Sequence, residues 1–78
     1  MPIPLYGFLK GDTVGLLLVA DEKETIQELS DRLQKSAEIR VVPQSSVRFI
    51  HKGMVLKSSL TIAESDLQPL DRFDVQPQ

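Results

Sequence analysis

The short segment Thr61–Pro69, "TIAESDLQP", constrains the fold of this 78-residue chain more than any other. Thr61 and Glu64 form the T-x-x-E pattern of a capping box, which normally opens an α-helix. Pro69 follows a few residues later, and a proline removes a helical hydrogen bond and clashes with the preceding turn. The segment therefore predicts a single helical or 3₁₀ turn, capped at Thr61 and ended by Pro69, that leads the chain into its last strand.

One longer helix is predicted in the segment from residue 25 to residue 37, where apolar residues recur at helical spacing. Thr25 is a favourable N-cap, and Glu28 stands three residues further on, which completes a second capping box. Glu28 and Arg32 are four residues apart, so we expect them to pair on the exposed side of the helix.

Short apolar segments on both sides of this helix have the length and composition of β-strands. They are residues 3–10, 14–20, 47–51, 54–56 and 72–75. Pro4 has no N–H to donate, so the first strand is expected near an edge or with the open side of Pro4 unpaired. The predicted order is β-β-α-β-β-turn-β, which gives one α+β domain over residues 1–78, with a mixed sheet of four to five strands packed on one helix.

Composition and charge exclude several classes of function. The net charge is −2, no run of basic residues exists and only 5% of the residues are aromatic, so nucleic-acid binding is disfavoured. The longest apolar run, Val14–Ala20, is far too short to span a membrane, and the N-terminus lacks the pattern of a signal peptide. We therefore expect a soluble, cytoplasmic and monomeric protein.

The residues that usually carry catalysis or bind metals are sparse. His51 is the only histidine and the chain has no cysteine, so neither a nucleophilic triad nor a zinc site is indicated. The four glycines are dispersed and form no phosphate-binding loop. We expect His51 to have a structural or surface role, and the sequence assigns no catalytic, cofactor-binding or metal-binding residue.

Two resemblances support this fold. "ETIQEL" and "VRFIHKGMVLKSSLTIAESDLQ" resemble the corresponding segments of ubiquitin, whose β-grasp fold has the same order of elements. From about Pro4 to Val75, the chain more closely resembles the gamma subunits of bacterial multicomponent toluene monooxygenases, the toluene 4-monooxygenase system protein B family. That resemblance is sharpest at Val41–Pro43, Thr61–Ser65 and Pro69–Val75.

The second resemblance implies a non-catalytic small subunit of a soluble di-iron hydroxylase for aromatic or other hydrocarbons. In that family the di-iron centre belongs to the large alpha subunit, so the implied partners are the alpha subunit and also the beta subunit, with no cofactor in this chain. The alternative is a free-standing bacterial ubiquitin-like adaptor. It would act without conjugation, since the chain ends in "DRFDVQPQ" rather than in Gly-Gly.

The predicted strand at residues 14–20 is apolar on both faces. If Val14, Leu16 and Leu18 face the helix, then Leu17 and Val19 point to the opposite face of the sheet. In an antiparallel sheet with one helix layer that second face is normally polar and wet. Leu17 and Val19 therefore indicate a surface that docks on another protein.

Other side chains are expected to extend this docking surface. If the strands pair as they do in ubiquitin, Ile50 and Leu5 lie beside Leu17 and Val19. Arg48 and Arg72 would then rim the apolar patch. The predicted protein interface consists of Leu17, Val19, Ile50, Arg48 and Arg72.

Overall fold

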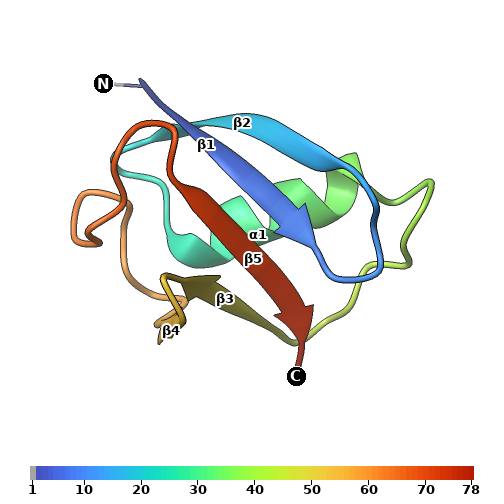
Figure 1. Ribbon diagram of the computed structural model, residues 1–78. Coiled ribbons are helices and arrows are strands. Elements are labelled where there is room, and N and C mark those ends of the chain that lie inside the picture. The colour runs from blue at the N-terminus through green and yellow to red at the C-terminus, as the bar shows by residue number, and fades with distance from the viewer. Residues whose placement is uncertain (1) are drawn as a thin grey trace.

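Residues 2–78 form five strands and one helix in the order predicted by the hydrophobic pattern of the chain. The computed structural model describes residues 2–78. Its elements are β1 (Pro2–Leu9), β2 (Gly15–Asp21), α1 (Ile26–Ser36), β3 (Val47–His51), β4 (Met54–Leu56) and β5 (Arg72–Pro77). Figure 1 shows α1 behind the sheet, with β1 and β5 running side by side in front of it.

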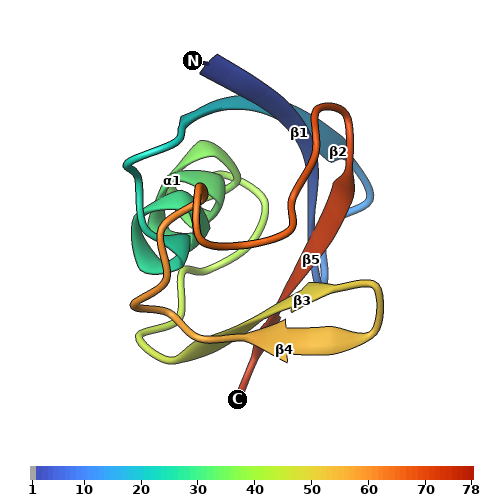
Figure 2. The same ribbon diagram turned by 90° about the vertical axis from the view of Figure 1, so that its left-hand side faces the viewer.

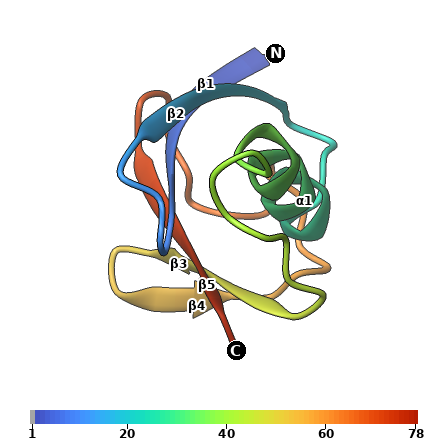
Figure 3. The same cartoon turned by 90° about the vertical axis from the view of Figure 1, so that its right-hand side faces the viewer.

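The five strands form one mixed sheet in the order β2-β1-β5-β3-β4. β1 pairs with β5 in parallel, whereas the β1–β2, β3–β4 and β3–β5 pairs are antiparallel. The last strand in the sequence is thus the central strand of the sheet, with one hairpin on each side. Figures 2 and 3 show the helix on one face of this sheet, which confirms the expected α+β fold class.

Pro4 lies in β1, which is an inner strand rather than an edge strand. The parallel pairing with β5 begins at Tyr6, whose N–H donates to Asp71 O at 2.9 Å. Residues two apart in a strand direct their backbone groups to the same side, so the N–H that Pro4 lacks would point to where β5 has not yet begun. The open side of Pro4 therefore explains its presence in the strand.

The helix begins with the predicted capping box. Thr25 Oγ1 accepts the backbone N–H of Glu28 at 3.1 Å, and Glu28 Oε1 accepts the backbone N–H of Thr25 at 2.9 Å. The predicted Glu28–Arg32 pair is wrong, because the Glu28 carboxylate is engaged at the cap. Arg32 instead reaches back to Glu24, with 2.8 Å between Nη1 and Oε1, and donates to Val19 O at 3.0 Å.

The core lies between α1 and the sheet. Phe49 and Phe73 stack at its centre, with ring centroids 4.5 Å apart and planes inclined by 13°. The other buried apolar residues are Leu5, Leu9, Leu18, Ala20, Ile26, Leu29, Leu33, Ala37, Ile62, Leu67 and Val75. Among the described residues no helix is long and apolar enough to span a membrane.

The segment around Thr61 crosses the start of the helix as a turn. Thr61 Oγ1 accepts the Glu64 N–H at 3.3 Å and Glu64 Oε1 accepts the Thr61 N–H at 2.9 Å, so the predicted cap is formed. One turn follows, in which the Ser65 N–H donates to Thr61 O at 3.1 Å. The predicted single helical or 3₁₀ turn is therefore present: the Glu64 N–H also donates to Thr61 O at 3.1 Å, and the chain then continues in irregular structure.

Tertiary hydrogen bonds explain why the turn is not extended. Ile26 N–H donates to Leu60 O and Ile62 N–H donates to Glu24 O, both at 2.8 Å, so backbone on either side of Thr61 is bonded to the start of α1. Ile62 and Leu67 insert into the core, with 1% and 4% of their surface exposed. The segment is therefore held by the helix it crosses rather than by a helix of its own.

Gly7 is required by the close approach of β5 and α1. A Cβ on Gly7 would lie 2.7 Å from Phe73 Cζ and 3.0 Å from Leu33 Cδ1, and both side chains are fully buried. We predict that Gly7→Ala lowers the free energy of unfolding by about 1–3 kcal/mol, because the core has no room for another methyl group. Urea denaturation measures this change, and a variant as stable as the wild type would contradict the packing.

The two capping boxes make the free energy of unfolding depend on pH in the acid range. The pKa values of Glu28 and Glu64 lie below the ordinary value of 4.5, because the backbone N–H and the hydroxyl of Thr25 and of Thr61 donate to them. In acid the unfolded chain therefore binds more protons than the folded chain. The stability from these groups is present above pH 4.5 and is lost as the pH falls through their lower folded values.

We predict that Glu64→Gln weakens this pH dependence. The amide keeps an oxygen that accepts the Thr61 N–H but does not titrate, so the unfolding free energy should fall less steeply from about pH 5 to about pH 3 than in the wild type. Glu38→Gln is the matched control, because the described residues offer the exposed Glu38 carboxylate no hydrogen-bond partner. Equal slopes for wild type and Glu64→Gln in urea titrations at several pH values would refute the prediction.

Candidate functional site

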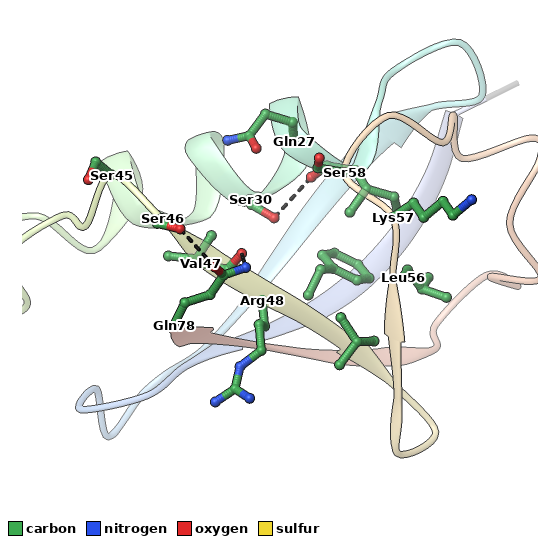
Figure 4. Close-up of a pocket in the computed structure, with 13 residues that line it drawn as sticks. Gln27, Ser30, Ser45, Ser46, Val47, Arg48, Leu56, Lys57, Ser58 and Gln78 are labelled. Atoms are coloured by element: carbon green, nitrogen blue, oxygen red, sulfur yellow. Dashed lines mark hydrogen bonds between the residues drawn. The ribbon is translucent and has the colours of Figure 1, made fainter.

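A polar hollow lies on the helix side of the sheet. Its volume is about 330 Å³, and it lies between the start of α1, strands β3 and β4 and the end of the chain (Figure 4). Some of its polar side chains are hydrogen-bonded within the chain: Ser46 Oγ donates to Gln78 Oε1 at 3.0 Å, and Ser30 Oγ donates to Ile26 O at 2.9 Å. No acidic residue or histidine is among the described residues that line it.

His51 is buried and connects β3 to the segment before β5. Its Nδ1 lies 3.1 Å from Asp66 Oδ1 and its Nε2 lies 3.1 Å from Asp71 Oδ2. The pKa of Asp71 lies below its ordinary value, chiefly because the Gln68 backbone N–H donates to its carboxylate. With both ring nitrogens engaged, His51 has a structural role, and no group of three or more metal-binding side chains occurs within residues 2–78.

The exposed apolar side chains predicted in the second strand lie on the face of the sheet away from α1. Leu17 is 55% exposed and Val19 is 51% exposed, while Leu18 and Ala20 between and beside them are buried against the helix. Val14 does not face the helix as expected, because β2 begins only at Gly15. The outer face of β2 is therefore apolar where a wet sheet face is normally polar.

Tyr6 belongs to this outer face but was not predicted to do so. It is 42% exposed and lies directly opposite Leu17 across the β1–β2 pair. Its position follows from strict alternation along β1, since its neighbours Leu5 and Gly7 are buried. The expectation that Leu5 joins the docking surface is wrong for the same reason: Leu5 is fully buried on the helix side.

The other predicted interface residues lie across the sheet from Leu17 and Val19. Ile50 is half-buried on the outer face of β3, opposite Val55 of β4 on one side and Asp74 of β5 on the other. Arg48 is exposed on the same strand, and Figure 4 shows its guanidinium pointing away from the helix. Because β5 is the central strand, Ile50 and the β2 side chains do not form one continuous apolar patch.

Arg72 lies on the outer face at the start of the central strand β5. Its cross-strand partner on β1 is Tyr6, and its guanidinium carbon lies 4.0 Å from the centroid of the Phe8 ring. Its Nη2 donates to Asp74 Oδ1 at 3.1 Å. Arg72 therefore borders the apolar side chains of the first hairpin and has partners within its own chain, and its place in an interface stays a prediction.

Leu70 is a second side chain that the sequence does not mark as part of the outer face. It is 61% exposed and precedes β5, and its N–H donates to Pro4 O at 2.6 Å. Since Pro4 is the cross-strand partner of Val19, Leu70 lies next to the apolar part of the outer face. We call Tyr6, Leu17, Val19 and Leu70 the β1–β2 patch.

Exposed apolar residues also occur at the opposite end of β1. Ile39 and Val42, in the loop between α1 and β3, are 92% and 73% exposed. Arg40 ties this loop to the β1–β2 turn through two hydrogen bonds to Asp12, of 2.9 and 3.0 Å. The Arg40 guanidinium holds the pKa of Asp12 below its ordinary value. These residues lie apart from the β1–β2 patch.

Solved structures of low sequence identity share this fold. A chain of "Toluene 4 monooxygenase HD Complex with Inhibitor 4-Bromobenzoate" matches with a TM-score of 0.90 and 22% identity over 100% of both chains. The ubiquitin of Caldiarchaeum subterraneum matches with a TM-score of 0.84 and 16% identity, over 100% of this chain and 95% of that one. The ubiquitin-like domain of a Plasmodium falciparum protein gives 0.81 and 15% over 100% of both chains.

These likenesses confirm the ubiquitin-like fold, and the sequence identifies the family. A comparison with curated protein sequences found no match. A family model described as toluene-4-monooxygenase system protein B matches residues 2–76, nearly the whole length of the chain. The chain therefore belongs to the toluene-4-monooxygenase system protein B family.

Proposed function

We propose that this chain is the non-catalytic small subunit of a di-iron monooxygenase hydroxylase for aromatic or other hydrocarbons. Its family membership supports an accessory role in such a system. Its likeness to one chain of a toluene 4-monooxygenase complex, over the full length of both chains, supports a hydroxylase as its partner. The chain docks on the large alpha subunit, and the beta subunit is the second candidate contact.

The observation that carries this proposal is the apolar character of the uncovered sheet face. Leu17 and Val19 are half exposed there, and Tyr6 lies opposite Leu17. An uncovered sheet face of a monomer is normally polar, because exposed apolar surface is left in contact with water. Docking on a large folded partner removes this surface from water.

The residues of the chain support a docking role rather than catalysis. The single histidine has both ring nitrogens within hydrogen-bonding distance of carboxylates, and residues 2–78 contain no candidate metal cluster. These side chains do not fit a di-iron centre, which needs several carboxylates and histidines that converge. The proposal therefore assigns the iron and the oxygen chemistry to the alpha subunit.

A free-standing ubiquitin-like adaptor is the second candidate, and the likeness to an archaeal ubiquitin favours it. The genes beside the one for this chain distinguish the two functions. Neighbouring genes for a di-iron alpha subunit, a ferredoxin and an effector protein would support the hydroxylase subunit. A neighbourhood without them would favour the adaptor.

We predict that Leu17→Asp combined with Val19→Asp disrupts docking without unfolding the chain. Both side chains are exposed in the isolated chain, so the carboxylates stay hydrated there but become buried without partners in the complex. Binding should weaken at least about tenfold, as for central interface residues. Size-exclusion chromatography of the variant co-expressed with the hydroxylase subunits measures co-elution, and circular dichroism verifies the fold.

Val55→Asp is the matched control. Val55 is 58% exposed on β4 and lies on the far side of β5 from Leu17 and Val19. This variant should co-elute with the hydroxylase like the wild type. Co-elution of the folded double variant at the wild-type level would refute docking through this face.

A further inference from the structure

Leu70 has a backbone conformation that leucine rarely adopts. Only two non-glycine residues in the described chain have a positive φ: Lys52, at 52°, and Leu70, at 69°. Lys52 is explained by the two-residue turn between β3 and β4, in which Gly53 follows with a φ of 78° and both central residues need a positive value. Leu70 lies in a different kind of turn.

The turn at Leu70 is one in which glycine is the usual residue. It runs from Gln68 to Asp71 and is closed by the Asp71 N–H, which donates to Gln68 O at 3.0 Å. Pro69 is its second residue and Leu70 its third, which is the pattern of a type II turn. The third residue of that turn has a positive φ and is normally glycine or asparagine, so leucine is strained there.

Surrounding contacts hold the strained turn in place. The Leu70 N–H donates to Pro4 O on β1, and the Gln68 N–H donates to Asp71 Oδ2 at 2.9 Å. The same Asp71 oxygen lies 3.1 Å from Nε2 of the buried His51. Backbone strain persists where neighbouring contacts impose it, and such strain is often found at binding sites.

Core packing does not explain why a leucine occupies position 70, because Leu70 is 61% exposed. Its backbone lies beside Pro4, one strand away from Val19. Asn or Gly would satisfy the turn without strain, so a leucine here adds exposed apolar surface beside Pro4, on the other side of β1 from Val19.

We propose that Leu70 is an anchor residue of the docking surface and inserts into an apolar site on the large hydroxylase subunit. This inference rests on the proposed function. Continuity with Leu17 and Val19 assigns the same occupant to all three side chains. The nearby charges of Arg72 and Asp74 pair with each other, so the docking surface is complementary to an uncharged surface on the partner. Because hydrogen bonds already constrain the backbone of this turn in the free chain, docking costs little backbone entropy there.

Competition for the hydroxylase tests this role. In this assay the hydroxylase complex contains a fluorescently labelled wild-type chain. Unlabelled wild type, Leu70→Asn or Leu70→Gly is added, and the displacement of the labelled chain is measured. We expect both variants to need at least about tenfold higher concentrations than the wild type for half-displacement. Their denaturation midpoints should equal or exceed that of the wild type, because both residues tolerate a positive φ.

Two control variants make the result specific. Ile39→Asn removes an apolar side chain that is even more exposed, at the opposite end of β1, and should compete like the wild type. The Leu17→Asp, Val19→Asp variant reports on the docking face itself. Loss of its competition while Leu70→Asn competes within about twofold of the wild type would overturn the anchor and leave the proposed function standing.

The remaining outcomes are also decisive. Wild-type competition by both the Leu17→Asp, Val19→Asp variant and the Leu70 variants would refute docking through this face together with the anchor. Failure of the labelled wild-type chain to bind the hydroxylase would refute the proposed function. A lower denaturation midpoint for Leu70→Asn would show that the leucine serves folding, which overturns the inference. Self-association of the isolated chain that Leu70→Asn abolishes would identify a second copy as the occupant and would also overturn it.

Discussion

The parallel pairing of β1 with β5 is the interaction on which the rest of the structure depends. It joins the first and the last strand of the chain and places β5 between the two hairpins. Neither hairpin alone has enough apolar surface to be stable in water, so this pairing is what creates a sheet that can cover α1. It also explains why Gly7 must lack a side chain, since Gly7 lies opposite Phe73 and a Cβ there would be 2.7 Å from Phe73 Cζ.

The same pairing determines the form of the outer face. With β5 at the centre, the mutually paired Arg72 and Asp74 separate the apolar side chains of β2 from Ile50. The segment that leads into β5 is brought against β1, which positions Leu70 beside Pro4. The docking surface thus combines the first hairpin with a turn that is distant from it in sequence.

Low sequence identity with a well-conserved shape is understandable from this architecture. A chain of the toluene 4-monooxygenase complex shares 22% of its residues with this protein at a TM-score of 0.90. The fold requires apolar residues at alternating positions of the strands and along one face of α1, but many combinations of Leu, Ile, Val and Phe fill such a core. Strain at Leu70, which costs about 1–2 kcal/mol, is tolerated because neighbouring hydrogen bonds impose the turn.

The sequence by itself determined the local structure, because the responsible interactions join residues close together in the chain. The capping boxes at Thr25 and Thr61, the turn at Gly53 and the alternation along each strand follow from contacts within a few residues. Only the tertiary structure decided that Arg32 bonds to Glu24 and Val19 O, that Arg72 lies opposite Tyr6 at the start of the central strand and that Leu5 is buried. It also decided the exposure and positive φ of Leu70, since strand order and long-range hydrogen bonds are set by chain closure rather than by local pattern.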